Sequence, residues 1–248
     1  MNPESVPFIS CEDQRQPVFG LFNFYASLSS VPLLYVPFSS LLTAVRLVDV
    51  KKRSPFIHMT LIAWLLTLTV LFFTNLFQHV LGGHRSIQLH ELLGAVQGLW
   101  HSCLLNALRR KNGWKSINER AGLTIAFVAT AAVFGASFSL GTDAHEAAVG
   151  VVSGLTGIFV VGSHGALSWR DEHAWRLFLR SCVGLLLVLT FTGPHGLEKK
   201  LCDLRASIGY HAIVDHACIV CLFGGVAQNA VHLVDRVVTK QCDEKKSN

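Results

Sequence analysis

The chain has 248 residues, of which 51% are hydrophobic and 15% are charged, and its mean hydropathy is +0.43. A soluble domain of this length carries about 25% charged residues, so the composition excludes an ordinary soluble globular protein. The net charge of +5 comes from basic residues that border apolar segments, where they face anionic lipid headgroups. No aromatic and basic patch of the RNA-binding kind occurs, and we expect no nucleic-acid partner.

Apolar segments follow one another along the whole chain. The hydrocarbon core of a bilayer is about 30 Å thick, and a helix needs roughly 20 apolar residues to cross it. The segments that meet this requirement lie at about residues 28–49, 57–81, 87–108, 121–141, 145–168, 175–194 and 208–235. The sequence therefore predicts an all-α fold, a polytopic membrane protein with a seven-transmembrane-helix bundle. We expect a tail at 1–16, a seven-span domain at 17–236 and a second tail at 237–248.

The distribution of basic residues predicts the orientation, because loops rich in Lys and Arg tend to stay in the cytosol. With seven spans, 16 of the 21 Lys and Arg residues fall on the side of the C-terminus and 5 on the other side. The N-terminus is therefore expected to be lumenal and the C-terminus cytosolic. The tail at 1–16 lacks the basic n-region of a cleaved signal peptide, and we interpret it as a short lumenal segment.

In this topology, polar residues from three spans converge on one layer at the lumenal side. They are Asn75 and His79 on the second span, His90 and Glu91 at the head of the third, and His211, Asp215 and His216 at the head of the seventh. An ionisable residue inside a span is a functional candidate by default, and it needs a partner. The layer is therefore the first candidate site.

Imidazole and carboxylate ligands suit zinc, and a catalytic zinc takes three protein ligands and a water. His79 together with His211 and Asp215, which are four residues apart on one helical face, would make such a set. A structural hydrogen bond between His211 and Asp215, without a metal, is the alternative, and it stays open.

The other histidines have simpler interpretations. His145 and Glu146 stand at the start of the fifth span, where a carboxylate favours a helix N-terminus, and we expect them to cap it. For four further histidines the sequence indicates no convergent partner, and we expect structural roles. These are His101, His164, His195 and His232.

The pattern of the polar layer resembles the alkaline ceramidase family, within a wider superfamily of seven-span hydrolases. In that family the second span ends with Ser and His four apart, Asp-Glu-Leu follows eleven residues later, and the seventh span opens with an aromatic residue and His-x-x-x-His. Here His79 matches the first zinc histidine, and HEL at 90–92 stands at the same interval. Tyr210 and His211 match the aromatic–His pair, and PFSSLL at 37–42 is loosely similar to a polar motif of the first span.

The departures from that pattern fall on the reacting positions. Asn75 stands where the family has Ser, and His90 stands where it has the Asp that acts on the attacking water. Asp215 replaces a zinc histidine, although His216 is adjacent as an alternative ligand. These changes favour a protein that binds lipid or a membrane partner without catalysis.

The alternative is a zinc-dependent hydrolase of a lipid amide or ester, so whether the protein is an enzyme stays open. In this reading the metal ligands are His79, His211 and Asp215. Glu91 or His90 is the general base, and Asn75 donates a hydrogen bond to the oxyanion. The resemblance also implies sphingolipid-like ligands and a membrane of the endoplasmic reticulum or Golgi, but it indicates no protein partner.

Cysteine usage predicts one disulfide. Of the seven cysteines, Cys11 and Cys202 alone fall on the predicted lumenal side, which is oxidising. The alkaline ceramidase family likewise pairs a cysteine of its N-terminal segment with one in the loop before the seventh span. We therefore expect a Cys11–Cys202 bridge.

Overall fold

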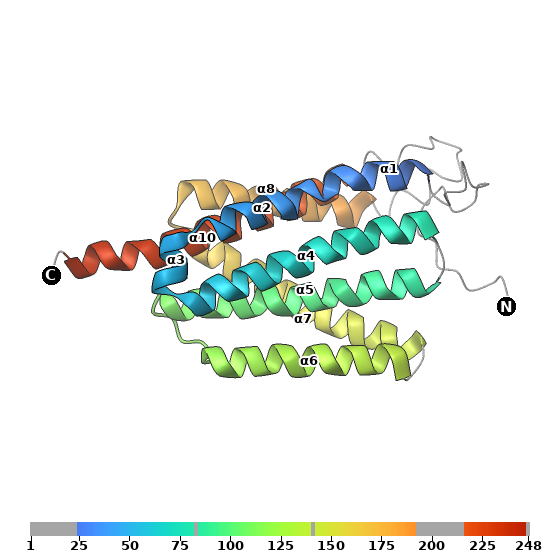
Figure 1. Ribbon diagram of the computed structural model, residues 1–248, viewed down its shortest axis with the longest axis horizontal. Helices are drawn as coiled ribbons and strands as arrows, with labels where there is room; N and C mark the ends of the chain where they lie inside the picture. Colours follow the sequence, from blue (N-terminus) through green and yellow to red (C-terminus); the bar gives the residue numbers. More distant parts are fainter. Residues whose placement is uncertain (1–23, 82–83, 140–141, 192–215, 247–248) are drawn as a thin grey trace.

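The computed structural model describes residues 24–81, 84–139, 142–191 and 216–246, and Figure 1 shows their arrangement. The helices are α1 (Phe24–Leu33), α2 (Tyr35–Val45), α3 (Val48–Arg53), α4 (Pro55–Leu81), α5 (His84–Lys111), α6 (Glu119–Ser139), α7 (Thr142–Ser168), α8 (Glu172–Phe191) and α10 (His216–Lys246). No strand occurs in these ranges, so the prediction of an all-α fold is confirmed for the described part of the chain.

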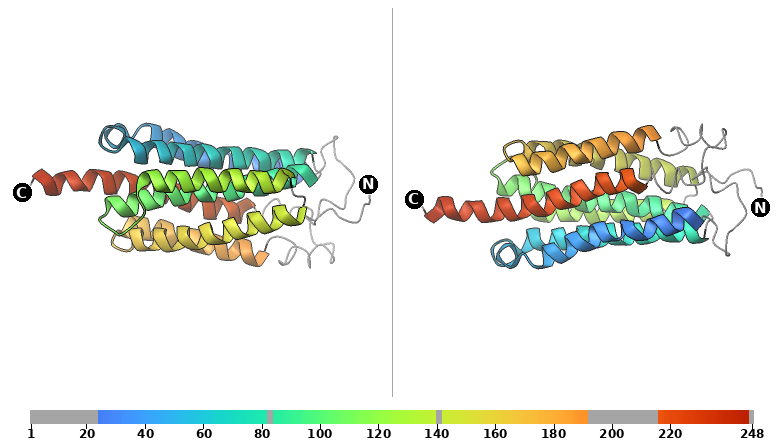
Figure 2. Two further views of the ribbon diagram at one scale, coloured as in Figure 1. Left: turned by 90° about the horizontal axis from the view of Figure 1, so that it is seen from below. Right: turned by 90° about the horizontal axis from the view of Figure 1, so that it is seen from above.

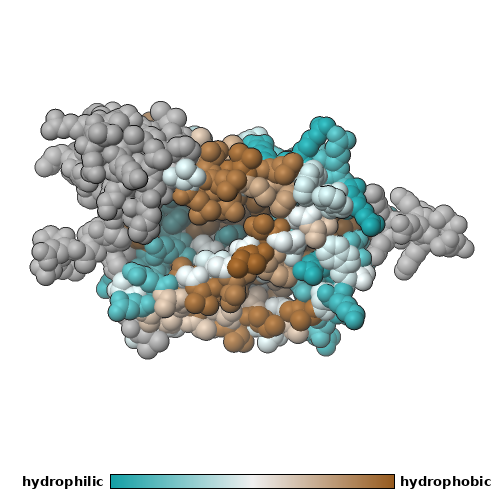
Figure 3. Space-filling view, turned by 180° about the vertical axis from the view of Figure 1, so that it is seen from behind, coloured by the Kyte–Doolittle hydropathy of each residue, from teal (hydrophilic) through white to brown (hydrophobic). Residues whose placement is uncertain are grey.

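Six helices are long and apolar enough to cross a membrane, judged by length and composition. They are Ser27–Val45, which joins α1 and α2, and Pro55–Val80, Glu119–Ser139, Thr142–Ser168, Glu172–Thr190 and His216–Thr239. Large apolar side chains such as Val151, Leu155 and Ile158 of α7 are exposed on the outside of the bundle. Figure 3 shows one such face as a band of apolar residues beside a hydrophilic end. The protein is therefore a multi-pass integral membrane protein.

The third predicted span corresponds to α5, which has 28 residues but is not apolar enough to stand among those six. It lies between α4 and α7 in the bundle and also packs against α6 (Figures 1 and 2). Polar side chains in its middle contact other helices: Gln97, for example, accepts a hydrogen bond from the indole of Trp64 on α4 at 3.1 Å. Polar residues within membrane bundles characteristically face the interior, and this placement explains the low hydropathy of α5.

The core is formed mainly by α4, α5 and α10. Half of the α4 and α10 spans is buried, against 11% of α7, so α7 belongs to the perimeter. Trp64 and Leu68 of α4 are completely buried, as are Leu104 of α5 and Leu233 of α10. This core fixes the helices that carry the polar residues discussed below.

Glycines let neighbouring helices approach closely. A Cβ atom on Gly184 of α8 would lie 2.5 Å from the backbone nitrogen of Leu222 on α10. A Cβ on Gly98 of α5 would lie 2.6 Å from Oγ1 of Thr156 on α7. Small residues at such contacts are typical of membrane helices, because close packing replaces the hydrophobic effect as the force between them. The α8–α10 pair is accordingly a tightly packed unit.

Two predicted boundaries differ from the structure. The first span ends at Val45 instead of residue 49, because a separate short helix, α3, carries the basic residues that follow it. At the other end, α10 continues as a helix to Lys246 and so includes most of the predicted tail at 237–248. In Figure 1 this last part of α10 extends beyond the other helices.

Candidate functional site

A polar layer lies at the end of the bundle where α4 ends and α10 begins. It comprises Ser29 and Ser30 of α1, Asn75 and His79 of α4, and His216 of α10. The His79 and His216 rings are 5.6 Å apart between centroids. His216 Nδ1 lies 2.6 Å from Ser29 Oγ, and Asn75 Nδ2 donates to Ser30 Oγ at 3.2 Å. The layer is therefore built by three helices, and all but Ser29 of its residues are buried.

This layer contains part of the predicted metal set. His79 lies beside His216, the alternative ligand, whereas His211 and Asp215 lie outside the described residues. Among the residues that the structure describes, no group of three or more His, Cys, Asp or Glu side chains could hold a metal ion. Because a catalytic zinc needs three protein ligands, the two described imidazoles alone do not fit one. The zinc site stays a prediction.

The predicted bases at the head of α5 have protein neighbours of their own. His90 Nδ1 lies 3.5 Å from Thr74 Oγ1 on α4. The Glu91 carboxylate, which is 46% exposed, pairs with His145 Nε2 on α7 at 3.0 Å. The other nitrogen of His145 lies 2.7 Å from Ser137 Oγ on α6. Within the described chain, Glu91 makes no hydrogen bond or ion pair to the polar layer.

The expectation that His145 caps its helix is wrong. α7 begins at Thr142 and has Asp143 in its first turn, so His145 lies inside the helix. The His145 side chain is 1% exposed and links α5 to α6 and α7.

A second polar cluster, the mid-bundle cluster, comprises His101 of α5, His164 and Ser168 of α7, and Asn229 of α10. The two imidazoles meet at 2.8 Å between their Nε2 atoms, so one donates and the other accepts. Asn229 Nδ2 lies 3.2 Å from His164 Nδ1 and donates to Ser168 Oγ at 3.0 Å. All four side chains are buried, and Trp64 stacks on His101 with 4.0 Å between ring centroids.

The expectation that His101 and His164 lack convergent partners is therefore wrong. They are 63 residues apart in the chain and meet only because α5 and α7 are neighbours in the bundle. The available signal was weak: each is a polar residue in an otherwise apolar segment, and such residues usually face the interior.

Two adjoining cavities lie between the helices, and we refer to them together as the inter-helix cavity. The first, of about 360 Å³, is bounded by α5, α7, α8 and α10 and reaches His101, His164 and Asn229. The second, of about 310 Å³, reaches Asn75 and His90. Both have mostly apolar linings, and they share four lining residues: Gly94, Gln97, Ser153 and Phe223. The inter-helix cavity thus extends from the polar layer to the mid-bundle cluster.

The inter-helix cavity has a hydrogen-bond acceptor without a partner and open space along its wall. Oδ1 of Asn229 is buried and has no hydrogen-bond partner among the described residues. A Cβ atom on Gly94 or Gly157, which both line the cavity, would meet nothing within 4 Å. The cavity can therefore accept a ligand group that donates a hydrogen bond at its deep end.

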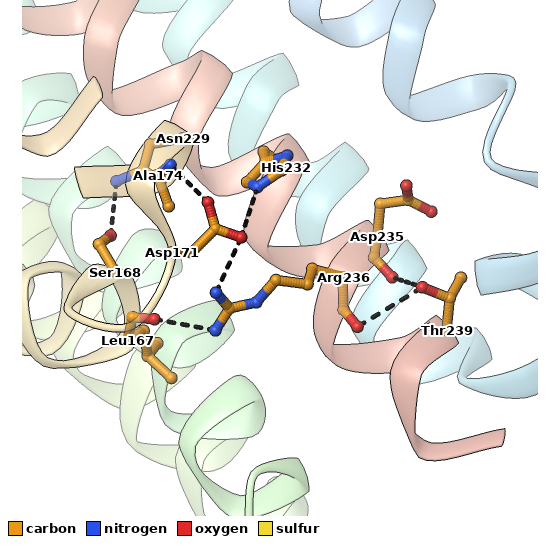
Figure 4. A network of polar contacts seen from close by, with 9 residues as sticks. All are labelled: Leu167, Ser168, Asp171, Ala174, Asn229, His232, Asp235, Arg236 and Thr239. Atoms are coloured by element: carbon orange, nitrogen blue, oxygen red, sulfur yellow. Dashed lines mark hydrogen bonds and ion pairs between the residues drawn. The ribbon is translucent and has the colours of Figure 1, made fainter. Parts of the chain in front are cut away.

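A third polar group joins the turn between α7 and α8 to α10, as Figure 4 shows. Asp171 accepts a hydrogen bond from the backbone N–H of Ala174 at 2.8 Å and one from His232 Nε2 at 3.2 Å. It also forms an ion pair with Arg236 at 2.9 Å, and Arg236 donates to the carbonyl of Leu167 at 3.2 Å. The expectation that His232 has no partner is wrong for the same reason as above.

Electrostatics favour the ionised form of Asp171. Burial raises the pKa of this carboxyl group, but the N–H of Ala174, Arg236 and His232 together lower it by more. The pKa of Asp171 is therefore held well below its usual value. These contacts hold the turn between α7 and α8 against α10 at the end of the bundle opposite the polar layer.

No protein-family model, curated protein sequence or solved structure matches this chain. The resemblance to alkaline ceramidases therefore stays a prediction from the sequence.

Proposed function

We propose that this protein binds a membrane lipid in the inter-helix cavity without catalysing a reaction on it. The observation that carries the proposal is the make-up of that cavity: mostly apolar walls with polar groups at both ends. Sites for small molecules are typically concave and apolar, with a few polar groups that fix orientation. A lipid with a polar group and an acyl chain matches this distribution.

The position of the opening supports a ligand that enters from the bilayer. Ser153, Gly157 and Val161 of α7 line the cavity and are also exposed on the outside of the bundle. The exposed surface around them includes Leu155 and Ile158, which are suited to contact with lipid. Figure 3 shows a hollow within the apolar band, with hydrophilic residues visible in it. A ligand could thus enter sideways without crossing water.

The contacts of the predicted catalytic residues support a role without chemistry. Asn75, the predicted oxyanion donor, donates its hydrogen bond to Ser30. Glu91, a predicted general base, is paired with His145. Polar contacts between membrane helices contribute about 0.6 kcal/mol each on average, so they can serve to hold the helices in place. Asn75 is also one of the positions at which the sequence departs from the ceramidase pattern, whereas Glu91 matches that pattern.

The finer membrane arrangement is part of the proposal. We count α5 as a further span, which makes seven, because its 28 residues have a length of about 42 Å as a helix and Gln97 and His101 in its middle contact other helices. The polar layer then faces the lumen, and the Asp171 group faces the cytosol. The resemblance adds a sphingolipid-like ligand and residence in the endoplasmic reticulum or Golgi.

Lipid labelling tests the proposal. The purified protein would be irradiated with a photoreactive, clickable ceramide analogue in detergent micelles and scored for covalent labelling. Gly157→Leu places a side chain in the cavity, whereas Gly154→Leu places the same side chain on the same helix, in equally open space outside the cavity lining. We expect labelling to fall several-fold in the first variant and to remain unchanged in the second. Equal labelling of the two variants would overturn the proposal.

The zinc-dependent lipid hydrolase remains the second candidate, and the proximity of His79 and His216 favours it. Metal analysis of the purified protein distinguishes the two functions. Stoichiometric zinc that is lost in His79→Ala and in His211→Ala, together with turnover of a lipid amide, would replace the proposal of binding alone. The His216→Ala variant would show whether the described imidazole or the pair at 211 and 215 completes the site.

A further inference from the structure

A separate cavity of about 400 Å³ lies beside the C-terminal half of α5. It is bounded by α5, α6, α7 and the connection between α5 and α6. We refer to it as the Arg109 cavity. Two cations line it, Arg109 and Lys115, and its neutral polar lining includes Ser102, Asn106 and Ser116. It has one lining residue, Thr156, in common with the inter-helix cavity, and otherwise the two are distinct.

The guanidinium of Arg109 has no acidic partner in the described part of the chain. Its Nη1 donates to Ser163 Oγ at 3.2 Å, and its Cζ lies 5.4 Å from the ring centroid of Trp114 and 5.5 Å from that of Phe159. Glu119, which begins α6, forms no ion pair with it. A partly buried cation between aromatic rings and without a counter-ion is costly, so this arrangement favours an anionic ligand.

Further hydrogen-bonding atoms in this region lack partners. Arg109 Nε, Ser102 Oγ and Ser116 Oγ are buried and make no hydrogen bond within the described residues. All three can donate, and the ammonium of Lys115 supplies more donors at the exposed rim. A phosphate group has several acceptor oxygens, and Arg is the residue best suited to bind it through two nitrogens.

The walls indicate that the anion belongs to an amphiphile. Ile125 of α6 and Leu155 of α7 line the cavity and are 55% and 67% exposed on the apolar outside of the bundle. An acyl chain attached to the anion can therefore lie against these two side chains. Basic residues at a membrane border are the usual place for anionic headgroups.

We propose that the Arg109 cavity binds the phosphate group of an anionic phospholipid, whose acyl chain lies against Ile125 and Leu155. The site lies in a different cavity from the proposed lipid site and takes a ligand of different charge. The inference is independent of what the inter-helix cavity binds.

Binding to the purified full-length protein in detergent tests this site, with dioctanoyl phosphatidic acid, dioctanoyl phosphatidylcholine and inorganic phosphate as probes. The dissociation constants would be measured by native mass spectrometry and thermophoresis. We expect phosphatidic acid to bind most tightly and Arg109→Gln to weaken its binding at least tenfold, about 1.4 kcal/mol, because charge-assisted hydrogen bonds are lost. Arg110→Gln is the matched control, since Arg110 is adjacent, exposed and outside this lining.

Three results would overturn the proposal. Phosphatidic acid could bind to Arg109→Gln within twofold of the unaltered protein, which would remove the site. Phosphatidylcholine could bind equally well, which would remove the preference for an anionic lipid. Inorganic phosphate could bind equally well, which would identify a site for a free anion. If Arg109→Gln does not fold, Lys115→Gln and Ile125→Trp replace it, and unchanged affinity in both would also overturn the proposal.

Discussion

Asp171 stabilises one end of the bundle through both of its carboxylate oxygens, and two substitutions separate their contributions. Its Oδ1 accepts the N–H of Ala174, which makes Asp171 the N-cap of α8. Its Oδ2 forms the ion pair with Arg236 on α10 and accepts a hydrogen bond from His232. Asp171→Asn keeps a capping oxygen and removes the charge, whereas Asp171→Ala removes both.

The burial of the pair sets the expected magnitude. The side chains of Asp171 and Arg236 are 17% and 15% exposed. Breaking a fully buried ion pair costs about 3–5 kcal/mol, and an exposed pair contributes about 0–1 kcal/mol. For this largely buried pair we expect Asp171→Asn to lower the free energy of unfolding by about 2–3 kcal/mol. Loss of the N-cap should add about 1 kcal/mol in Asp171→Ala.

The low pKa of Asp171 makes this contribution depend on pH. A carboxyl group whose pKa is lower in the folded than in the unfolded state stabilises the fold fully above the unfolded value, about 3.9. That stabilisation is lost as the pH falls through the folded pKa. The difference in stability between the unaltered protein and Asp171→Asn should therefore be constant above about pH 5 and shrink below about pH 4.

Equilibrium unfolding in mixed micelles with increasing SDS, followed by tryptophan fluorescence, measures these differences at neutral and acidic pH. Glu172→Gln serves as the control, because Glu172 forms an ion pair with Arg176 in which both side chains are more than 70% exposed, and we expect no measurable change. The reasoning would be refuted if Asp171→Asn were as stable as the unaltered protein at pH 7, or if Asp171→Ala were no less stable than Asp171→Asn.

Three further outcomes are expected. Gly184→Ala should lower the free energy of unfolding by about 1–3 kcal/mol, because the added Cβ meets the α10 backbone, whereas Gly154→Ala should leave it unchanged or raise it; both are measured in the same SDS titration. His145→Ala should cost about 1–2 kcal/mol by that measurement, since it removes two part-buried contacts between helices, and a neutral result would contradict their importance. Cys11 and Cys202 should react with a maleimide only after reduction, and labelling of both in non-reduced protein would disprove the bridge.

Hydropathy predicted the spans well because apolar length is what the bilayer requires. Six of the seven predicted segments coincide with helices that are apolar enough to cross. The segment that became α5 is the exception, and residues such as Gln97 and His101 explain it. They are polar because they contact other helices, so the residues that matter for the site also weaken the span signal.

The site was predictable only where a shared depth in the bundle is enough to bring residues together. His79 stands at the end of α4, and a helix that enters from the same side brings His216 to the same depth. The contact between His101 and His164 also depends on which helices are adjacent and on how each is rotated about its axis. Local periodicity along one helix carries no information on either its neighbours or its rotation against them. The mid-bundle cluster could not be predicted for this reason.

The length of α10 connects the inter-helix cavity to a distant point. The same helix carries Phe223 and Asn229 in the cavity wall and continues to Lys246 beyond the other helices. From Asn229 to Lys246 the helix extends about 25 Å, so it acts as a lever arm. A tilt of about 10° at the cavity would displace the tip by about 4 Å, given that rise per residue. A small displacement of α10 at the cavity would thus be several-fold larger at the C-terminal end of the helix, where a reporter group could detect it.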